Sequence, residues 1–460
     1  MKITGKELQQ WGIKTGPIYR VLIETIDRLD LHRKQAKNIV RSIKKNPEAY
    51  LGDEDWGAVA KLLMPPVDKT IWLNKDSCPV KIYGKNMIED GALDQIEIAS
   101  RLPISVQAAC MPDGHQGYGL PIGGVLATDN VVIPFAIGFD IACRMHLTIT
   151  DIPVGNMEGM RDKLRNVLVD NTFFDTGCKQ DGKNDDAIMD DDRFDIPSIK
   201  KLKLKAQSGL GTSGSGNHFV EYGKANIDGI DGEWLAILSH SGSRGFGYSI
   251  ADFYTKLATE KCKLEKIAQH LAWLSMDDED GQEYWEAMSL AGDYAKACHG
   301  IIHSRIVKGL SCKVQTEYEN HHNFAWKDKI EVNGEFKDVI VHRKGATPAG
   351  LGVMGIIPSS MSTPAYLVEG KGCAESLCSS SHGTGRMMSR KKAKETFTMS
   401  DMKKDLESKG IELIGGGLDE CMSAYKAIEA VMYEQRDLVS IKGGFNPWMI
   451  RMAVEQAKKW

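Results

Sequence analysis

The sequence predicts an α/β (α+β) fold in which strands and helices alternate through one large interleaved domain. Its 460 residues are enough for a large core or for two to three average domains. Short β-type runs broken by Gly and Pro fill about residues 70–150 and return at 330–390, whereas residues 250–310 and 400–435 have apolar residues at helical spacing. No internal repeat or low-complexity linker divides these stretches, so one domain is expected over two separable ones.

Composition places the chain among soluble globular proteins. Apolar residues make up 42% and charged residues 26%, and the formal net charge of -4 excludes a polycation, although a local basic groove would suffice to bind nucleic acid. The N-terminus is polar, and no apolar stretch approaches the roughly 18–20 residues that span a bilayer. Because the ten cysteines form no CxxC pair, we expect a cytoplasmic protein whose functional cysteines would be metal ligands or nucleophiles.

Three stretches outside the main pattern have predictions of their own. Residues 17–46 combine helical spacing with abundant Lys and Arg, which predicts one or two amphipathic helices. Their polar face is either an ordinary surface or a basic face used for RNA. Residues 179–197 are acidic and aperiodic, which favours an exposed insertion over an acidic metal site. Residues 445–460, FNPWMIRMAVEQAKKW, are expected to form a short amphipathic helix after Pro447.

Five segments combine Gly-rich turns with residue types that bind metals. Each has an apolar flank that would anchor it and a loop that would present polar side chains. Their carboxylate, thiolate and imidazoles suit a borderline divalent ion such as Mn²⁺, Fe²⁺, Co²⁺ or Zn²⁺. Because one thiolate can bridge two ions, Asp140, Cys143 and three histidines could hold a two-metal site. The segments are MPDGHQGYG (111–119), GFDIAC (138–143), GSGNHFVE (214–221), ILSHSGSRGFG (237–247) and ENHHNFAW (319–326).

Each of these segments also has a plainer interpretation when taken alone. A single His between a strand and a loop is usually a hydrogen-bonded core residue. Asp140 could be a cap, and Cys143 could be a small buried hydrophobe. Taken together, five Gly-flanked polar segments in one chain favour an active site, but they do not identify its reaction.

A sixth segment, CSSSHGTGRMMSR (378–390), has the composition of a phosphate-binding loop. His382 lies between a serine run and a Gly-x-Gly turn, where small residues let a backbone approach closely. Arg386 and Arg390 would share one face if they were helical and could then grip phosphates. An imidazole there could act as acid, base or nucleophile toward phosphorus; the alternative is a Gly-rich turn with solvated side chains. Lys442 lies in a strand-like run, where a surface charge is the default.

In this order, the segments resemble signatures of the RtcB family of RNA-splicing and RNA-repair ligases. The resemblance runs from about residue 80 to 444 and implies a catalytic domain over 71–444, with mixed sheets surrounded by helices and an active site in a central cleft. A helical N-terminal extension (1–70) and a helical C-terminal extension (445–460) would flank it. The stretches that match are MPDGHQGYGLPIGG, GFDIAC, GSGNHFVE, HSGSRG, HRKGAT and SHGTGRMMSR.

The resemblance implies an RNA ligase that uses GTP and two Mn²⁺ ions. The family joins RNA ends bearing a 2′,3′-cyclic phosphate or 3′-phosphate to 5′-hydroxyl ends, in RNA repair or tRNA splicing. It does so through a GMP–histidine and an RNA-(3′)pp(5′)G intermediate. Some members rely on the small protein archease, and the sequence does not decide whether this chain does; no membrane partner is implied.

Motif matching also implies a role for individual residues. His382 matches the histidine that is guanylylated, and Asp113 lies at a further active-site position. In the HHN stretch the family's ligand precedes Asn, which selects His322 over His321. The other implied positions are, for metal, Asp140, Cys143 (bridging), His218, His240 and His322; for GTP, Asn217, Glu221, Ser360, Gly383, Gly385, Tyr425 and Lys442; and for RNA phosphates, Arg244, Lys344, Arg386 and Arg390.

Some positions depart from the family pattern. SSMST (359–363) stands where a GSMGT-like stretch is usual, so Ser359 and Ser362 replace glycines. Pro348 stands where an arginine is common, and about sixteen residues follow the IKG that usually ends the family. These departures suggest a divergent bacterial-type member devoted to repair of cleaved RNA.

Two other functions compete with ligation. A two-metal phosphoesterase that only opens cyclic phosphates would need the metal ligands but neither His382 nor Lys442, and both are present. A non-catalytic RNA-binding module would tolerate the loss of ligands, and none is lost. The sequence therefore favours the ligase.

Overall fold

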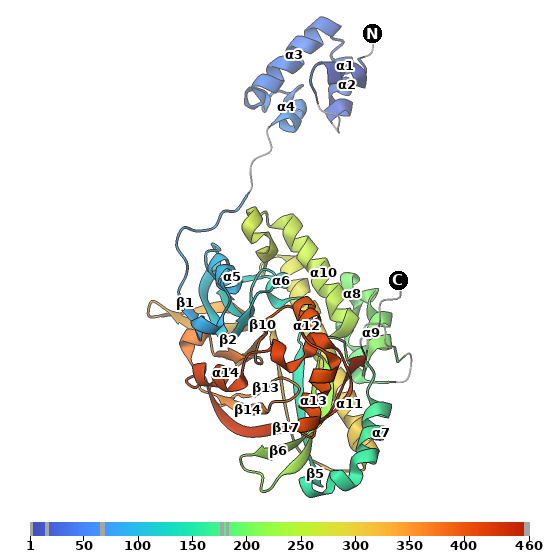
Figure 1. Ribbon diagram of the computed structural model, residues 1–460. Helices are drawn as coiled ribbons and strands as arrows, with labels where there is room; N and C mark the ends of the chain where they lie inside the picture. Colours follow the sequence, from blue (N-terminus) through green and yellow to red (C-terminus); the bar gives the residue numbers. More distant parts are fainter. Residues whose placement is uncertain (1–2, 14–17, 65–69, 175–178, 181–183, 455–460) are drawn as a thin grey trace. The chain divides into compact units, whose positions relative to one another are not determined.

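The computed structural model describes residues 3–13, 18–64, 70–174, 179–180 and 184–454. The chain divides into two compact units, Met1–Thr70 and Ile71–Trp460 (Figure 1). Within the described ranges, no helix combines the length and the apolar character that crossing a membrane requires. The nine cysteines in these ranges are all free thiols.

The N-terminal unit consists of short helices around a core of its own. The two amphipathic helices expected over 17–46 are found, with a break near residue 30. Leu22 and Ile26 on one helix, and Val40 and Ile43 on the next, recur at helical spacing and are buried together. The helices are α1 (Gly5–Gln10), α2 (Ile18–Arg28), α3 (Arg33–Lys45) and α4 (Gly57–Leu63).

The larger unit is organised around a mostly antiparallel eight-stranded sheet that nearly closes on itself. The strand order is β13–β14–β17–β6–β7–β5–β9, with β16 parallel to β17. Its two end strands approach each other, and the Ile356 N–H donates to the side-chain carbonyl of Asn320 at 2.8 Å. The strands are β5 (Arg144–Pro153), β6 (Phe219–Ile227), β7 (Trp234–Ser241), β9 (Val314–His321), β13 (Met354–Ile357), β14 (Ala365–Gly370), β16 (Glu412–Gly416) and β17 (Val439–Val454).

A second, five-stranded sheet has the order β1–β2–β3–β11–β10. Asn333 and Gly334 join β10 to β11, and both have positive φ, as a two-residue hairpin turn requires. Two short strand pairs, β12–β15 and β4–β8, complete the sheets. The strands are β1 (Val80–Ile82), β2 (Ser105–His115), β3 (Ile122–Thr128), β4 (Val131–Val132), β8 (Leu274–Ser275), β10 (Asn323–Val332), β11 (Glu335–Lys344), β12 (Ala346–Pro348) and β15 (Ser379–Ser381).

Helices cover the sheets, and the 32-residue α11 (Glu279–Leu310) packs against β5 and β7. This arrangement of mixed sheets and covering helices confirms the predicted α/β fold class. The remaining helices are α5 (Asp90–Ser100), α6 (Pro134–Ile137), α7 (Arg161–Asn171), α8 (Pro197–Lys200), α9 (Lys203–Gly209), α10 (Arg244–Lys261), α12 (Arg390–Thr396), α13 (Met399–Ser408) and α14 (Ile428–Glu434).

The expected C-terminal helix over 445–460 is wrong for the residues that the structure describes. Residues 445–454 continue β17, which pairs with β6 on one side and β16 on the other. Pro447 is accommodated where the register with β6 shifts, as is usual for a proline inside a sheet. A short apolar run can fit either a helix or a buried strand, and here the two neighbouring strands decide.

Two smaller expectations also need correction. Within the acidic stretch 179–197, Met189 and Phe194 are buried in the core, so the expected exposure is wrong there; residues 181–183 lie outside the described ranges. Arg386 and Arg390 do not share a helix, because α12 begins at Arg390 and Arg386 lies in the preceding loop.

Candidate active site

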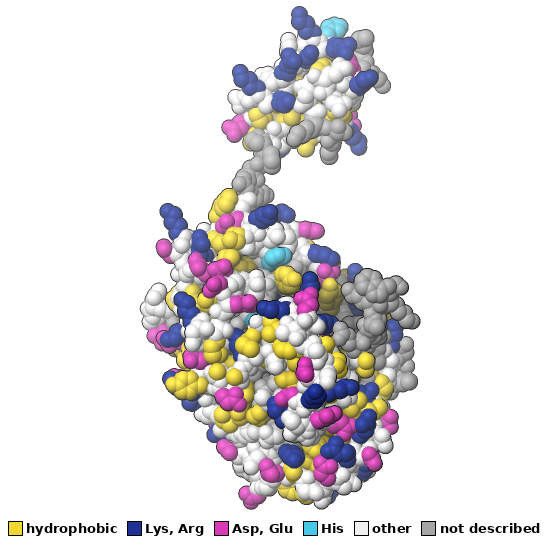
Figure 2. All heavy atoms as spheres, in the orientation of Figure 1, with side chains coloured by type: hydrophobic (Ala, Val, Ile, Leu, Met, Phe, Trp, Pro, Cys, Tyr) yellow, Lys and Arg dark blue, Asp and Glu magenta, His cyan; other side chains and the backbone are white. Residues whose placement is uncertain are grey.

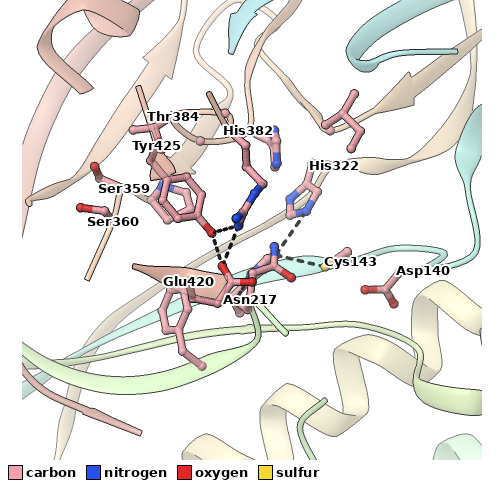
Figure 3. Close-up of a pocket in the computed structure, with 18 of the residues that line it drawn as sticks. Asp140, Cys143, Asn217, His322, Ser359, Ser360, His382, Thr384, Glu420 and Tyr425 are labelled. Carbon is pink, nitrogen blue, oxygen red and sulfur yellow. Dashed lines mark hydrogen bonds and ion pairs between the residues drawn. The ribbon is translucent and has the colours of Figure 1, made fainter. Parts of the chain in front are cut away.

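A cavity of about 370 Å³ lies where the two large sheets meet (Figure 3). The eight-stranded sheet contributes Glu221 and His240 to its wall, and the five-stranded sheet contributes Lys344. The loop after β15 contributes His382. Segments far apart in the sequence therefore line one cavity.

The GFDIAC turn leads from α6 into β5 and brings Asp140 and Cys143 to the cavity. Ala142 adopts a left-handed conformation (φ 54°), and its N–H donates to the Asn323 carbonyl at 2.7 Å. The Asn323 side chain in turn donates to the Asp140 carbonyl at 3.2 Å. Gly242 packs on the other side, where a Cβ would overlap the Asp140 carboxylate.

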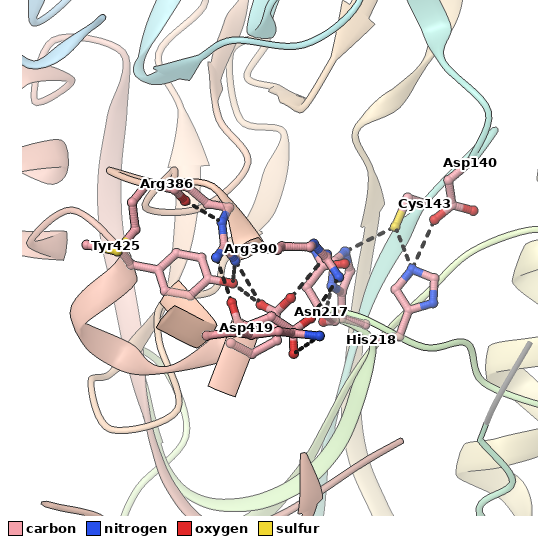
Figure 4. Close-up of polar contacts among 12 residues, drawn as sticks. Asp140, Cys143, Asn217, His218, Arg386, Arg390, Asp419 and Tyr425 are labelled. Carbon is pink, nitrogen blue, oxygen red and sulfur yellow. Dashed lines mark hydrogen bonds and ion pairs between the residues drawn. The ribbon is translucent and has the colours of Figure 1, made fainter. Parts of the chain in front are cut away.

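Four side chains with metal-binding atoms converge around the Cys143 thiol. The Cys143 Sγ lies 3.5 Å from His218 Nε2 and 3.1 Å from His240 Nε2. His218 Nε2 lies 3.0 Å from Asp140 Oδ2, and His240 Nε2 lies 3.4 Å from His322 Nε2. The contacts thus form two groups that share the thiol: Asp140 and His218 on one side (Figure 4), and His240 and His322 on the other.

Neighbouring groups fix the direction in which these imidazoles point. His240 Nδ1 lies 3.0 Å from the Asn217 carbonyl oxygen, to which it donates, so the Nε2 lone pair is directed at Cys143. His218 comes just before β6 and His322 lies between β9 and β10. The His322 N–H donates to the Cys143 carbonyl at 3.1 Å, which ties the two segments together.

The charge state of the cluster suits metal binding. Burial lowers the pKa of His240 to about 3 and that of His322 well below its usual value, so both imidazoles are neutral with free lone pairs. Burial alone would raise the pKa of Asp140, but the adjacent His218 lowers it to about 2. Burial raises the pKa of the Cys143 thiol, and a bound cation would reverse that effect.

His382 lies beside this cluster and is held by a buried carboxylate. Its ring centroid lies 4.9 Å from that of His322. The His382 Nδ1–H donates to Asp113 Oδ2 at 2.6 Å, and the backbone N–H groups of His382 and Gly383 donate to the same oxygen. Burial alone would raise the pKa of Asp113, but the charge of His382 and this hydrogen bond lower it. With Nδ1 protonated, Nε2 is the ring nitrogen with a free lone pair.

A glycine allows the loop that carries His382 to pack closely against the backbone of Asp113. Gly385 has φ +72°, and a Cβ there would overlap the Asp113 carbonyl. The second glycine of the His-Gly-x-Gly turn is therefore required by packing on Asp113.

A network of arginines and carboxylates forms the opposite wall (Figure 4). Arg386 donates to the Tyr425 hydroxyl at 3.0 Å and contacts Glu420 at 3.3 Å. Arg390 pairs with Glu420 at 3.1 Å and with Asp419 at 3.3 Å. The Tyr425 hydroxyl also donates to Glu420.

Comparison with known proteins identifies the family. A profile of the family described as "tRNA-splicing ligase RtcB" matches residues 95–195 and 176–452. The chain belongs to the RtcB family. It is 33% identical to the "tRNA-splicing ligase RtcB" of Nanoarchaeum equitans, over 81% of this chain and 95% of that protein. It is 32% identical to the "RNA-splicing ligase RtcB" of Escherichia coli K12, over 80% and 96%. With the "RNA-splicing ligase RtcB homolog 1" of Entamoeba dispar, the identity is 30% over 68% and 72%.

This finding confirms the RtcB resemblance, and the chain is an enzyme. The cavity brings together most of the positions that the resemblance implied. Asp113 and His218 lie directly behind the cavity wall, in contact with His382 and Cys143. The implied residues that line the cavity are Asp140, Cys143, Asn217, Glu221, His240, His322, Lys344, Ser360, His382, Gly383, Gly385, Arg386, Arg390 and Tyr425.

Besides Asp113 and His218, two implied cations are not part of the cavity lining. Lys442 lies on β17 and pairs with Glu369 at 2.7 Å. Arg244 begins α10, and its Nε–H donates to the Thr212 hydroxyl at 3.1 Å. Lys442 is therefore paired away from the cavity lining. The Arg244 guanidinium instead lies close to His218, because a Cβ on Gly214 would be 2.6 Å from Arg244 Nη1 and 2.0 Å from His218 Nδ1.

The two serines expected at positions of family glycines fit their places in the structure. Ser359 and Ser362 are absent from the described residues with positive φ, so their backbone accepts a side chain without strain. Ser359 and Ser360 both hydrogen-bond to the Thr363 hydroxyl, at 2.5 and 2.8 Å, and both line the cavity. Ser362 accepts a hydrogen bond from Lys409 at 3.0 Å.

Sequence reasoning missed two groups of residues. Asp419 and Glu420 form ion pairs with Arg386 and Arg390 in the cavity wall, but no sequence motif marked these two carboxylates. A second buried histidine cluster contains His146, His299 and His303, whose nitrogens lie close enough together to hold a metal. The i, i+4 spacing of His299 and His303 on a helix could have signalled this second cluster.

Proposed function

We propose that this chain is an RNA ligase that joins a 2′,3′-cyclic phosphate or 3′-phosphate RNA end to a 5′-hydroxyl end, using GTP. The observation that carries the proposal is the position of His382. Its Nδ1 is fixed by Asp113, its Nε2 is free, and its ring lies 4.9 Å from a histidine of the Cys143 cluster. A phosphoesterase that only opens cyclic phosphates has no need of such a nucleophile.

The first step is attack by His382 Nε2 on the α-phosphorus of GTP. The new N–P bond forms as the bond from phosphorus to the leaving pyrophosphate breaks, which leaves GMP on the histidine. Asp113 keeps the proton on Nδ1 and stabilises the positive charge that develops on the ring. Glu221, whose pKa burial raises well above its usual value, lines the cavity and would face the nucleotide.

The donor set around Cys143 fits two borderline divalent cations, and we propose that both are Mn²⁺. Asp140, Cys143 and His218 would hold one, and Cys143, His240 and His322 the other, because the side-chain contacts fall into those two groups. When bound, the two ions would neutralise charge on the phosphates and polarise the attacking oxygen.

Two further displacements complete the reaction. A 3′-phosphate oxygen of the RNA attacks the histidine-bound phosphorus, breaks the N–P bond and forms the RNA-(3′)pp(5′)G end. The 5′-hydroxyl of the second RNA then attacks the 3′-phosphate, and GMP leaves as the new phosphodiester forms. A cyclic end is first opened by water to the 3′-phosphate. Lys344, Arg386 and Arg390 are the cavity cations that would hold RNA phosphates.

The test is a joining assay with two short RNAs. One ends in a 3′-phosphate or cyclic phosphate, and the other is a labelled strand that begins with a 5′-hydroxyl. We expect a joined product that requires GTP and Mn²⁺ and is lost in His382→Ala. A product in which the cyclic phosphate is opened but no strands are joined would instead support the phosphoesterase.

A further inference from the structure

We propose that helix α3 of the N-terminal unit is a binding surface for the phosphate backbone of RNA. This inference rests on the proposed ligase function, because it names a second place where the RNA substrate is held. The RtcB profile begins at residue 95, so the N-terminal unit lies outside the part of the chain that defines the family. The unit has its own core and is free to carry a binding function of its own.

One face of α3 carries a continuous stripe of basic side chains. The helix, RKQAKNIVRSIKK, has six Lys or Arg residues among its 13 and no acidic residue. Lys34, Lys37, Arg41 and Lys45 follow one another at spacings of three or four residues, which places them along one face. At 1.5 Å per residue the stripe is about 16 Å long.

These four cations are available to a partner. The other two basic residues of α3 are used within the unit: Arg33 pairs with Glu7 at 2.6 Å, and Lys44 donates to the Gly12 carbonyl at 2.7 Å. No carboxylate among the described residues lies within ion-pair distance of the four stripe cations. Figure 2 shows Lys and Arg side chains gathered on the visible face of this unit.

The remaining side chains of α3 favour RNA over a membrane or a protein. The apolar face, including Val40 and Ile43, is buried in the unit's own core and is not available for insertion into a bilayer. Gln35, Asn38 and Ser42 are exposed along the same helix. Gln35 Oε1 accepts from the His32 N–H and Ser42 bonds to the Tyr50 hydroxyl, so the amide NH₂ groups of Gln35 and Asn38 are the donors that suit sugar and phosphate oxygens. Protein interfaces are instead depleted in lysine at their centres.

The test uses the full chain with Lys34, Lys37, Arg41 and Lys45 all changed to Gln, which keeps helix propensity and removes charge. The probe is a single-stranded RNA with hydroxyls at both ends, which cannot be ligated. Its Kd is measured over a range of salt concentrations. Because each phosphate contact contributes about 0.7 to the slope of log K against log salt, we expect the slope to fall by about 3 in magnitude.

A matched control removes four positive charges from the same unit but from other elements: Lys6→Gln, Arg20→Gln, Arg28→Gln and Lys61→Gln. We expect a slope close to that of the wild type. A variant with Lys34→Arg, Lys37→Arg and Lys45→Arg should also retain the slope, because it keeps the charge.

Three outcomes would overturn the proposal: an unchanged slope in the α3 variant, an equal fall in the matched control, or α3-dependent binding to anionic lipid vesicles but not to RNA. Self-guanylylation of the wild-type chain, measured without RNA, separates this inference from the proposed ligase function. Failure of that reaction would count against ligation, whereas the salt slope would still test α3.

Discussion

Two buried histidine clusters lie on opposite faces of the same pair of strands, and both have nitrogens close enough together to hold a metal, but only one includes a thiol and opens onto a cavity. His240 and Ser239 are consecutive on β7, so their side chains point to opposite sides of the sheet. His240 faces the cavity with Cys143. Ser239 faces α11, where it hydrogen-bonds to His299 Nδ1 and His303 Nε2, both at 2.7 Å.

The two clusters differ in donor chemistry and in what satisfies their nitrogens. The cavity cluster adds a thiol and a carboxylate to its imidazoles and opens onto solvent-accessible space. In the α11 cluster, Thr148 lies 2.8 Å from His303 Nδ1 and donates to Glu317 at 2.9 Å. Hydroxyl groups therefore contact both nitrogens of His303 and Nδ1 of His299, whereas His146 and His299 Nε2 have no hydrogen-bond partner among the described residues. The comparison teaches that a count of buried histidines does not define a metal site. Since Glu317 lies 3.5 Å from His146 Nε2, a nearby carboxylate is common to both clusters, and the thiol and the open face are what distinguish the cavity cluster.

The largest effect should come from removing the shared thiol. We expect Cys143→Ala to lose bound metal and to reduce RNA joining to the level of the metal-free protein, because both ligand groups depend on this one atom. Metal content by mass spectrometry of the purified protein measures the first effect. A Cys143→Ala protein that keeps full metal content would show that the wrong cluster has been chosen.

The next largest effect should come from Asp113→Asn. The amide cannot act as the carboxylate acceptor that keeps the His382 proton on Nδ1, so we expect self-guanylylation to slow by on the order of 10³-fold. Metal content should stay unchanged, which distinguishes this effect from that of Cys143→Ala. A normal rate of guanylylation in Asp113→Asn would remove Asp113 from the proposed mechanism.

A smaller effect should appear in the pH dependence of RNA binding. Burial lowers the pKa of Lys344 to about 7, so its positive charge is present below pH 7 and is lost as the pH rises above it. If Lys344 holds a phosphate, RNA affinity should weaken by up to about tenfold between pH 7 and 8. The measurement is Kd against pH for wild type and Lys344→Met, and the variant should lack this part of the profile. The same dependence of Kd on pH in wild type and Lys344→Met would contradict a role of Lys344 in holding phosphate.

The smallest effect on ligation should come from the α11 cluster. We expect His303→Leu to keep its metal content but to lose about 2–4 kcal/mol of stability, because Ser239 and Thr148 lose a buried partner. Burial lowers the pKa of His299 and His303 well below the usual value, so below about pH 6.5 the unfolded state binds more protons and wild-type stability falls. Denaturant titrations at pH 7 and 5.5 should show a smaller fall for the variant. Loss of metal in His303→Leu would overturn the comparison.

How much of this could be predicted from the sequence depends on how local the signal is. The Gly-flanked segments marked Asp140, Cys143 and His240 because a tight turn beside an apolar strand is visible in a few residues. The roles of Asp419 and Glu420 were not visible, since they follow from contacts with arginines about thirty residues away. The partner of Lys442 likewise lies on another strand.

The strand at the C-terminus shows the same limit for secondary structure. Residues 445–454 have an apolar pattern that fits a short helix as well as a strand. Their neighbours β6 and β16, distant in sequence, supply the backbone hydrogen bonds that select the strand. Local pattern therefore predicted elements and donor residues, whereas pairing between distant segments decided the rest.

The most direct test of the central claim is guanylylation of His382 beside the Cys143 cluster. The chain is incubated with GTP labelled at the α-phosphorus and Mn²⁺, with and without RNA and archease, and the labelled peptide is identified by mass spectrometry. We expect one labelled peptide, within residues 378–390, that is absent in His382→Ala and in Cys143→Ala. No label under any of these conditions, or a label that persists in His382→Ala, would contradict it.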